Sequence, residues 1–330
     1  MHVMIIGAAG MLGHQLAQQF AKHPSIANTP VEIMTLVDIT QPPTHAQFQG
    51  QQRPIATDLS SPQAAAQLIA TRPDVIFHLA AIVSGEAEAD FDKGYRINLD
   101  GSRQLFEAIR LAGSQEPYLP RVVFASSLAV FGAPLPDVIP DDYLFAPLTS
   151  YGTQKAISEL LLNDYARRRF IDGIAIRLPT ICIRPGQPNR AASGFFSNIL
   201  REPLSGKEAV LPVSENVRHW FASPRAGVGF LLHAAAIDLS SLGGRRALSM
   251  PGVSATVSEQ LAALQRVAGP KALKLIRRQP DPAIQHMIDS WPRSFDAARA
   301  LALGFRADAS IDDIIQVHID DALHGKLSIS

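Results

Sequence analysis

Three glycines at regular spacing, Gly7, Gly10 and Gly13, follow an apolar run at the start of the chain. The run Val3–Ile6 predicts a buried strand and Leu12–His23 predicts a helix, so the glycines occupy a strand-to-helix turn. Gly7 would permit the tight turn, Gly10 a close backbone approach to phosphate, and Gly13 close packing of the helix on the strand. Free backbone N–H groups and the positive end of the helix dipole would then face an anion. The spacing predicts a dinucleotide-binding turn, and a glycine-rich turn without a ligand is the alternative.

Short apolar runs alternate with helical patterns through the first half of the chain. Buried strands are expected at Val3–Ile6, Glu32–Val37, Val75–Leu79, Val122–Ala125 and Ile174–Arg177, and helices at Leu12–His23, Ser61–Ala70, Arg96–Ala112 and Tyr151–Phe170. This alternation and spacing predict parallel βαβ units, that is, an α/β fold with a doubly wound parallel sheet of the Rossmann type.

The pattern changes after Arg177, where proline, glycine and arginine become frequent. We expect residues 1–177 to form the dinucleotide-binding domain, with residues 221–250 returning to it, and residues 178–220 and 251–330 to form a smaller substrate-binding lobe. The later elements expected are helices at Phe221–Ala236, Ser258–Ala268, Phe295–Ala302 and Ile311–Gly325 and a strand at Arg246–Met250. The lobe is expected over the carboxyl ends of the strands, where open α/β sheets bind ligands.

Composition narrows the class of protein. Of the 330 residues 47% are apolar, which is enough for a sizeable core, and 30 basic residues balance 30 acidic ones. A zero formal charge gives no electrostatic reason to expect nucleic acid or an anionic membrane as a partner. The single cysteine, Cys182, lies in an apolar run and is expected to be buried rather than nucleophilic. A lone thiol cannot form an internal disulfide framework and suits a reducing cytosol, so a cytoplasmic protein is expected. The sequence shows neither a signal-peptide pattern nor an apolar stretch of ~20 residues.

Acidic and small residues follow the next expected strands. Asp38 ends the second strand, where a carboxylate can hold the adenosine ribose and repel a 2′-phosphate, so NAD is favoured over NADP. Asp58–Leu59 would flank the adenine, although an N-terminal helix cap at Asp58 is equally compatible with the sequence. The small residues of Leu79–Ala81 would let the backbone lie along the cofactor. The expected cofactor is NAD, and no metal is expected.

Tyr151 and Lys155 are separated by four residues at the start of a long expected helix, so both side chains share one face. A hydride leaves a carbon only if the hydroxyl proton is removed at about the same time, and tyrosine, with an ordinary pKa near 10, is a weak base. A neighbouring ammonium favours tyrosinate. Ser127, after a buried strand, would hold the substrate oxygen. A surface Tyr–Lys contact and a strand-end serine turn are the alternatives.

Together these motifs resemble the extended short-chain dehydrogenase/reductase superfamily, also called the NAD-dependent epimerase/dehydratase superfamily. The matching residues are Gly7, Gly10, Gly13, Asp38, Asp58–Leu59, His78–Ala81, Asn98, Ser126–Ser127, Val130–Gly132, Tyr151 and Lys155. The resemblance implies a Rossmann fold, NAD, and a catalytic triad of Ser127, Tyr151 and Lys155, with Asn98 bracing the site. The residues expected to bind the cofactor are Gly7, Gly10, Met11, Leu12, Gly13, Asp38, Asp58, Leu59, Leu79, Ala80, Ala81, Asn98, Tyr151, Lys155 and Pro179.

The sequence departs from the pattern of members that act on nucleotide-diphosphate sugars. Thr180 replaces an asparagine that helps to hold the diphosphate, Phe131 replaces a tyrosine, and Arg218–Arg225 lacks two acidic positions of the corresponding family motif. A closer resemblance, to the D-erythronate dehydrogenase subfamily, rests on Ser150–Ala156, Arg177–Thr180, Arg184–Ser193, Arg201–Leu204 and Arg218–Trp220. That resemblance implies NAD-dependent oxidation of the C2 hydroxyl of a four-carbon sugar acid to 2-oxo-tetronate.

A small sugar acid carries one carboxylate and several hydroxyls. Arginine suits a planar carboxylate, so Arg184 and Arg218 are candidates, and a structural ion pair is the alternative for each. The expected substrate-binding residues are Ser84, Ser127, Tyr151, Thr180, Arg184, Asn189, Ser193 and Arg218, and His219 is a further candidate partner for a hydroxyl.

Two other functions stay open at this point. One is a nucleotide-diphosphate-sugar 4-epimerase or dehydratase; Leu128–Ala129 lacks the acidic pair typical of dehydratases. The other is an NAD-sensing scaffold protein. A homodimer is expected through Arg96–Ala112 and Tyr151–Phe170, because Leu160–Leu162 adds more apolar surface than a solvated helix needs.

Overall fold

The computed structural model describes residues 1–186 and 193–328. The chain forms two compact units, and each is described by itself: the first comprises residues 1–130, 149–177 and 228–248, and the second residues 131–148, 178–227 and 249–330. The binding of NAD by the first unit and of substrate by the second stays a prediction. None of the helices in the described ranges has the length and apolar character needed to cross a bilayer.

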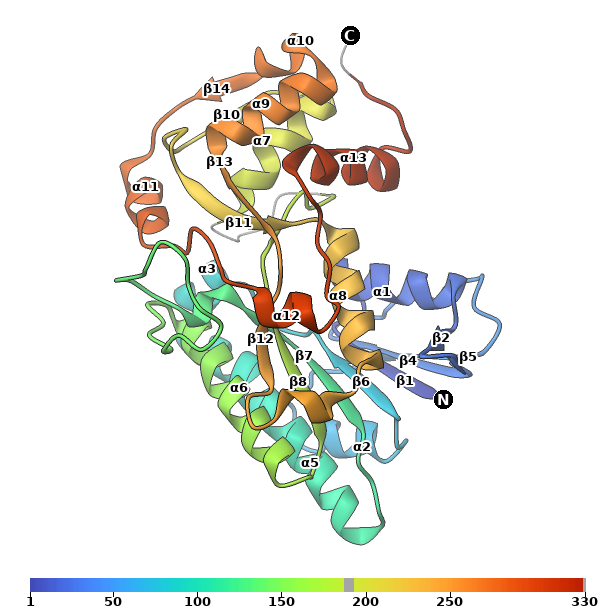
Figure 1. Cartoon of the computed structure of the whole chain (residues 1–330). Coiled ribbons are helices and arrows are strands. Elements are labelled where there is room, and N and C mark those ends of the chain that lie inside the picture. The colour runs from blue at the N-terminus through green and yellow to red at the C-terminus, as the bar shows by residue number, and fades with distance from the viewer. Residues whose placement is uncertain (187–192, 329–330) are drawn as a thin grey trace. The chain divides into compact units, whose positions relative to one another are not determined.

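The first unit is an α/β sandwich around one twisted sheet (Figure 1). Its strands are β1 (His2–Ile6), β4 (Ile33–Asp38), β5 (Gln51–Ala56), β6 (Val75–His78), β7 (Arg121–Ser127), β8 (Asp172–Leu178) and β12 (Ala247–Ser249), with a small hairpin of β2 (Ser25–Ile26) and β3 (Thr29–Pro30). Its helices are α1 (Met11–Lys22), α2 (Ala64–Ile69), α3 (Ser84–Ala89), α4 (Phe91–Gly94), the π-helical turn η1 (Tyr95–Asp100), α5 (Gly101–Gln115), the 3₁₀ turn η2 (Leu128–Val130), α6 (Ser150–Arg167) and the 3₁₀ turn η3 (Leu239–Leu242); α8 (Pro224–Ala236) begins in the second unit and ends in the first.

Strand order confirms the predicted Rossmann fold. In the described part of the chain the sheet runs β12-β8-β7-β6-β1-β4-β5, and the pairs from β7 to β5 are parallel. The chain winds outward in both directions from β1, so the order reverses between β1 and β6. Ligands of such sheets bind at the carboxyl ends of the two strands that flank this reversal. Gly7 follows β1 and Leu79 follows β6, so both expected cofactor segments lie at this switch point.

Buried apolar side chains explain why the predicted strands form. Every residue of β1 is buried, and the helices α2, α5 and α6 pack side by side on one face of the sheet (Figure 1). Phe106, Phe124 and Leu162 are fully buried in this layer. The hydrophobic effect, at about 25 cal/mol per Å² of apolar surface, thereby fixes the sheet that carries the candidate site.

The secondary structure expected from the sequence misses one strand and misplaces the start of one helix. The missed strand is β5, which shows no apolar run because this edge strand is polar and contains Pro54, a residue that a sheet tolerates at its edge. The helix expected from Phe221 begins only at Pro224, because Phe221 belongs to a strand, β11 (Arg218–Ala222), that pairs with its neighbours. Buried strands and buried helices give the same short apolar run, which explains the second error.

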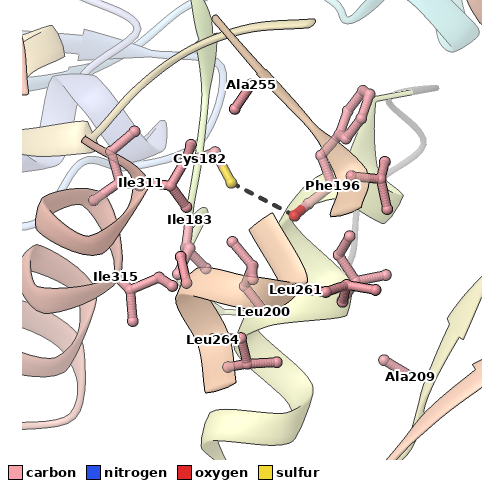
Figure 2. Close-up of a cluster of buried hydrophobic side chains, with 14 of the residues drawn as sticks. Cys182, Ile183, Phe196, Leu200, Ala209, Ala255, Leu261, Leu264, Ile311 and Ile315 are labelled. Carbon is pink, nitrogen blue, oxygen red and sulfur yellow. Dashed lines mark hydrogen bonds between the residues drawn. The ribbon is translucent and has the colours of Figure 1, made fainter. Parts of the chain in front are cut away.

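The second unit combines small sheets with helices. Its other elements are β9 (Thr180–Ile181), α7 (Gly194–Leu204), β10 (Ala209–Leu211), β13 (Val253–Thr256), α9 (Val257–Ala268), α10 (Pro270–Leu273), β14 (Ile276–Arg278), α11 (Pro282–Asp289), α12 (Ala298–Ala302) and α13 (Ile311–Ala322). In the described residues β13, β11 and β9 form one sheet, and β10 pairs with β14. The core lies between α7, α9 and α13, where Leu200, Leu264 and Ile315 converge (Figure 2).

Cys182 lies inside this core, as the sequence predicts. Its side chain is buried, and its Sγ donates a 3.5 Å hydrogen bond to the carbonyl oxygen of Phe196, the dashed line of Figure 2. Burial raises the pKa of the Cys182 thiol to about 12. The thiol is therefore protonated at neutral pH and is not a nucleophile.

Candidate active site

The glycine turn after β1 is packed too tightly for side chains. Gly7 has φ +96°, and a Cβ there would lie 2.7 Å from the backbone nitrogen of Ala80. A Cβ on Gly13 would lie 2.0 Å from the carbonyl oxygen of Gly7, so α1 could not approach the turn. These contacts bring Gly7, Gly13 and the Leu79–Ala80 backbone together as the glycine spacing predicts.

The amino end of α1 is arranged to receive an anion. Gly10 is the N-cap and supplies no side chain, and the first helical turn holds no acidic residue. Ala9 and Gly10 are exposed, and Met11 and Leu12 are half-buried, so a ligand can reach the amino end of the helix. A pyrophosphate would take the place of the missing cap, at the positive end of the helix dipole. The turn therefore fits a dinucleotide.

Asp38 is held beside this turn. One carboxylate oxygen accepts the Ala9 N–H at 2.9 Å and the other accepts the Ile39 N–H at 2.7 Å. Each oxygen keeps a lone pair for a ribose hydroxyl, and the negative charge would repel a 2′-phosphate. This geometry fits the sugar of NAD.

Asp58 has a local role that the sequence did not resolve. Its carboxylate accepts hydrogen bonds from the Ser60 backbone and hydroxyl and pairs with Arg96 at 2.8 Å. Burial raises the pKa of Asp58, but the hydrogen bonds from Ser60 and Arg96 outweigh it and leave the pKa below its ordinary value. Helix α2 begins after Gln63, so the alternative of an N-cap at Asp58 is wrong. Leu59 is buried in the core and Gly101 lies beside it.

Asn98 braces the loop after β6 against the helix that carries Tyr151. Its Oδ1 accepts the Ile82 N–H at 2.9 Å, and its Nδ2 donates to Gln154 at 2.7 Å and to the Ile82 carbonyl at 3.2 Å. Asn98 sits in the π-helical turn η1 and is 1% exposed. π-Helical turns often mark functional sites. The side chain thus ties Ile82, which follows Leu79–Ala81, to Gln154 of α6.

The start of α6 sets the position of Tyr151. Thr149 is the N-cap, and its hydroxyl accepts the Gly152 N–H at 3.0 Å. The Ser150 N–H donates to Glu88, from α3, at 3.0 Å. Two orphan donors of the first turn are thereby satisfied, which fixes the helix one residue before Tyr151. Ser84, an expected substrate-binding residue, begins α3 and is half-buried.

Lys155 lies one turn further along α6 and is 2% exposed. Its Nζ donates to the Ala125 carbonyl oxygen at 2.9 Å and lies 5.8 Å from the centre of the Tyr151 ring. Burial lowers the pKa of Lys155 to about 8, while the negative charge of Glu159 acts in the opposite direction. Ala125 is two residues before Ser127, at the end of β7. The structure therefore brings the carboxyl end of β7 close to the face of α6 that carries Tyr151 and Lys155.

The sequence did not predict a buried ion pair that lies one helical turn after Lys155 on α6. Glu159 and Arg177 have side chains only 1% and 5% exposed, and the Arg177 Nη2 lies 2.9 Å from the Glu159 Oε2. The Arg177 Nε reaches the same carboxylate at 3.1 Å, and the Ser126 hydroxyl donates to its other oxygen. The spacing of Tyr151, Lys155 and Glu159 at four-residue intervals on one helix face was the signal available in the sequence.

The substrate candidates of the second unit fall into separate groups. Arg184 donates to the Ile181 carbonyl at 3.1 Å and to the hydroxyl of Ser193 at 2.9 Å, so these two candidates lie together. Arg218 instead bonds the Ser254 carbonyl and pairs with Glu259 at 3.2 Å. Pro179 is buried beside Thr180, and Asn189 lies outside the described residues.

Arg218 also lines a pocket of about 500 Å³ within the second unit. The other polar side chains around it come from the segment 131–148, from the segment before β11, and from α11 and the loop that follows: Asp137, Ser214, Asn216, Gln285, Asp289 and Arg293. His219, by contrast, is 2% exposed, and both of its ring nitrogens are hydrogen-bonded inside the protein. The expectation that His219 meets a substrate hydroxyl is therefore wrong.

Comparison with known proteins places this geometry in a family. Residues 3–223 match the model of the NAD dependent epimerase/dehydratase family. Two relatives named D-erythronate dehydrogenase are similar along almost the whole chain. The protein from Cupriavidus necator is 45% identical over 98% of this chain and 99% of its own length, and that from Haemophilus influenzae is 42% identical over 97% and 99%.

Solved structures agree with the fold. The crystal structure titled nucleoside-diphosphate-sugar epimerase, from Agrobacterium tumefaciens, is 63% identical, with a TM-score of 0.97 over 99% of this chain and 95% of that one. The GalE-like L-threonine dehydrogenase from Cupriavidus necator shares the fold at 20% identity, with a TM-score of 0.82 over 97% and 99% of the two chains. The chain therefore belongs to the NAD dependent epimerase/dehydratase family, and its cofactor is NAD.

Proposed function

We propose that this enzyme oxidises the C2 hydroxyl of D-erythronate to 2-oxo-tetronate, with Tyr151 as the base. The observation that carries the proposal is the buried ammonium of Lys155, which lies 5.8 Å from the centre of the Tyr151 ring and is anchored beside Ser127 at the end of β7. The two relatives named D-erythronate dehydrogenase support the choice of substrate.

Each residue of the proposed triad has a separate role. Tyr151 takes the proton of the C2 hydroxyl, and the positive charge of Lys155 stabilises the tyrosinate that accepts it. With a pKa of about 8, Lys155 is mostly protonated at pH 7. Ser127 donates its hydroxyl hydrogen to the substrate oxygen, while its own Oγ accepts the Ala129 N–H at 3.2 Å. Bound NAD supplies the acceptor for the hydride that leaves C2.

The substrate carboxylate requires a cation. We propose Arg184 or Arg218, because a guanidinium can donate two parallel hydrogen bonds to a carboxylate. Arg184 is fixed by Ile181 and Ser193, whereas Arg218 borders an open pocket. Ser84, Thr180, Asn189 and Ser193 stay proposed contacts for the hydroxyl groups.

The test is the formation of NADH from NAD and D-erythronate by the purified protein. We expect an absorbance rise that depends on both compounds, and a much smaller rate with NADP because of Asp38. Related aldonates and UDP- and dTDP-sugars are tested in parallel. No NADH with any sugar acid, together with conversion of a nucleotide sugar, would replace this proposal by the second one.

The second candidate function is epimerisation of a nucleotide-diphosphate sugar. The 63% identical protein from Agrobacterium tumefaciens carries that title, which is the observation in its favour. An epimerase regenerates its cofactor and accumulates no NADH, so the two candidates give different signals in the same assay. A scaffold that only senses NAD would give neither signal.

We further propose a cytoplasmic homodimer in which α5 and α6 of two copies pack together. Leu160 on α6 is 60% exposed and Leu111 on α5 is 48% exposed, whereas Leu162 is fully buried. We expect a solution mass of twice the chain mass, and a shift to the monomer mass in Leu160→Glu. The control is Leu144→Glu, at a site in the other unit that is 80% exposed and should not change the mass. A monomeric wild type would contradict the proposal.

A further inference from the structure

Thr180, where the sequence departs from the nucleotide-sugar pattern, contacts His219 in the other departing segment, Arg218–Arg225. Thr180 begins β9 and His219 is the second residue of β11, and these strands pair in parallel with Phe221 opposite Thr180. The Thr180 Oγ1 lies 2.7 Å from the His219 Nε2. Thr180 and His219 therefore form one hydrogen-bonded unit.

The direction of this hydrogen bond follows from the other side of the ring. The His219 Nδ1 lies 2.8 Å from the carbonyl oxygen of Pro292, which can only accept, so Nδ1 carries a hydrogen. The ring stacks on Phe196, with centroids 5.2 Å apart and planes within 3°, which fixes its orientation. Burial, with a smaller contribution from the charge of Arg184, lowers the pKa of His219 to about 4. The ring is neutral at pH 7.

A neutral imidazole holds a single N–H hydrogen. Because Nδ1 holds it, Nε2 must accept, and the Thr180 hydroxyl must donate its only hydrogen to His219. The Thr180 oxygen is left with lone pairs alone. It can accept a hydrogen bond from a ligand but has nothing to donate.

We propose that His219 is a positioning residue that makes Thr180 a hydrogen-bond acceptor, so that this subsite selects a substrate hydroxyl and rejects a phosphoryl oxygen. A hydroxyl of a polyhydroxy acid can donate to the Thr180 oxygen. A diphosphate oxygen has no hydrogen at neutral pH, so its lone pairs would face those of the Thr180 Oγ1 and repel them. The inference rests on the proposed function, because it takes Thr180 as a substrate contact.

The first test compares two acids that differ in hydroxyl groups. D-Erythronate carries hydroxyls at C3 and C4, and 2-hydroxybutanoate lacks both. We expect Thr180→Val to lower kcat/KM for D-erythronate about 10-fold, mainly through KM, because one hydrogen bond to the substrate is lost. The same variant should change kcat/KM for 2-hydroxybutanoate by less than about threefold. Thr180→Ser keeps the hydroxyl and serves as the control. Equal losses on both acids would overturn the proposal.

The second test addresses His219. His219→Phe keeps the stacking on Phe196 but removes the acceptor, and we expect the same selective loss on D-erythronate as in Thr180→Val. The double variant should be no worse than either single variant, because both remove the same interaction. His219→Gln offers an amide oxygen to Thr180 and should recover part of the loss. Additive losses, or a His219→Phe variant as active as the wild type, would contradict the proposed coupling.

A readout without substrate separates this inference from the proposed function. In protein labelled with ¹⁵N-histidine, with His219→Gln used for assignment, the His219 signals should show a neutral ring protonated on Nδ1 from pH 6 to 8. A ring protonated on Nε2 would overturn the inference even in an active enzyme. Failure of the wild type to oxidise any sugar acid would overturn the proposed function and the substrate preference, while the tautomer still decides the direction of the hydrogen bond.

Discussion

Tyr151→Phe should lower kcat for sugar-acid oxidation by about three orders of magnitude, within the usual range for removal of a general base. The ring and its packing stay, but the oxygen that takes the hydroxyl proton is gone. Binding of NAD should change little, because the glycine turn, the open end of α1 and Asp38 are untouched. Single-turnover NADH formation measures the chemical step, and calorimetric titration with NAD measures the binding.

The matched control lies on the same helix. Tyr165 donates its hydroxyl hydrogen to Glu107 at 2.9 Å, and its ring packs at a tilt against Phe106 in the helical layer. Tyr165→Phe should leave kcat within about twofold. If Tyr151→Phe retained most of the wild-type kcat, Tyr151 could not be the base, and the proposed division of roles would have to be abandoned.

Glu159→Gln should destabilise the first unit by about 3–5 kcal/mol, the usual cost of removing one partner of a buried ion pair. The Arg177 guanidinium is only 5% exposed and would lose the carboxylate that its Nε and Nη2 contact, with little solvent to replace it. Urea unfolding followed by circular dichroism measures the change. Asp164→Asn is the control, because Asp164 pairs with Arg167 on the same helix but both side chains are at least 60% exposed. Its effect should stay below about 1 kcal/mol.

A second readout distinguishes positioning from bulk stability. Glu159 raises the pKa of Lys155, so Glu159→Gln should lower that pKa further below its value of about 8. The ammonium that stabilises the tyrosinate would then be lost at a lower pH, and the alkaline fall in kcat should begin earlier. Replacing both partners, in Glu159→Met with Arg177→Met, should recover much of the stability. A stable Glu159→Gln protein with an unchanged pH profile would contradict both expectations.

The predictable parts of the fold are those with strong local patterns. The strands β1, β4, β6, β7 and β8 and the helix that begins beside Tyr151 were predicted because each is an apolar run or a periodic segment bounded by turn residues. The glycine turn was predicted because backbone contacts there exclude side chains, and only glycine meets that requirement. The edge strand β5 lacks such a pattern, since it buries little apolar surface.

The parts that could not be predicted depend on partners far apart in the sequence. Glu159 and Arg177 are 18 residues apart, Thr180 and His219 are 39 apart, and His219 and Pro292 are 73 apart. From the sequence alone, a histidine is equally compatible with a ligand-binding role and with a packed structural role. Only the fold shows that His219 is enclosed and that its second nitrogen meets a carbonyl. The sequence therefore identified His219 as a candidate residue but could not predict the orientation of its side chain.

The buried thiol of Cys182 can report the unfolding of the second unit. With its Sγ bonded to Phe196 and the core of α7, α9 and α13 closed around it, the sulfur meets an electrophile only when that core opens. The rate of alkylation then follows the population of the opened form. Because the sequence contains a single cysteine, a bulk thiol assay reports on this one unit without any labelled variant.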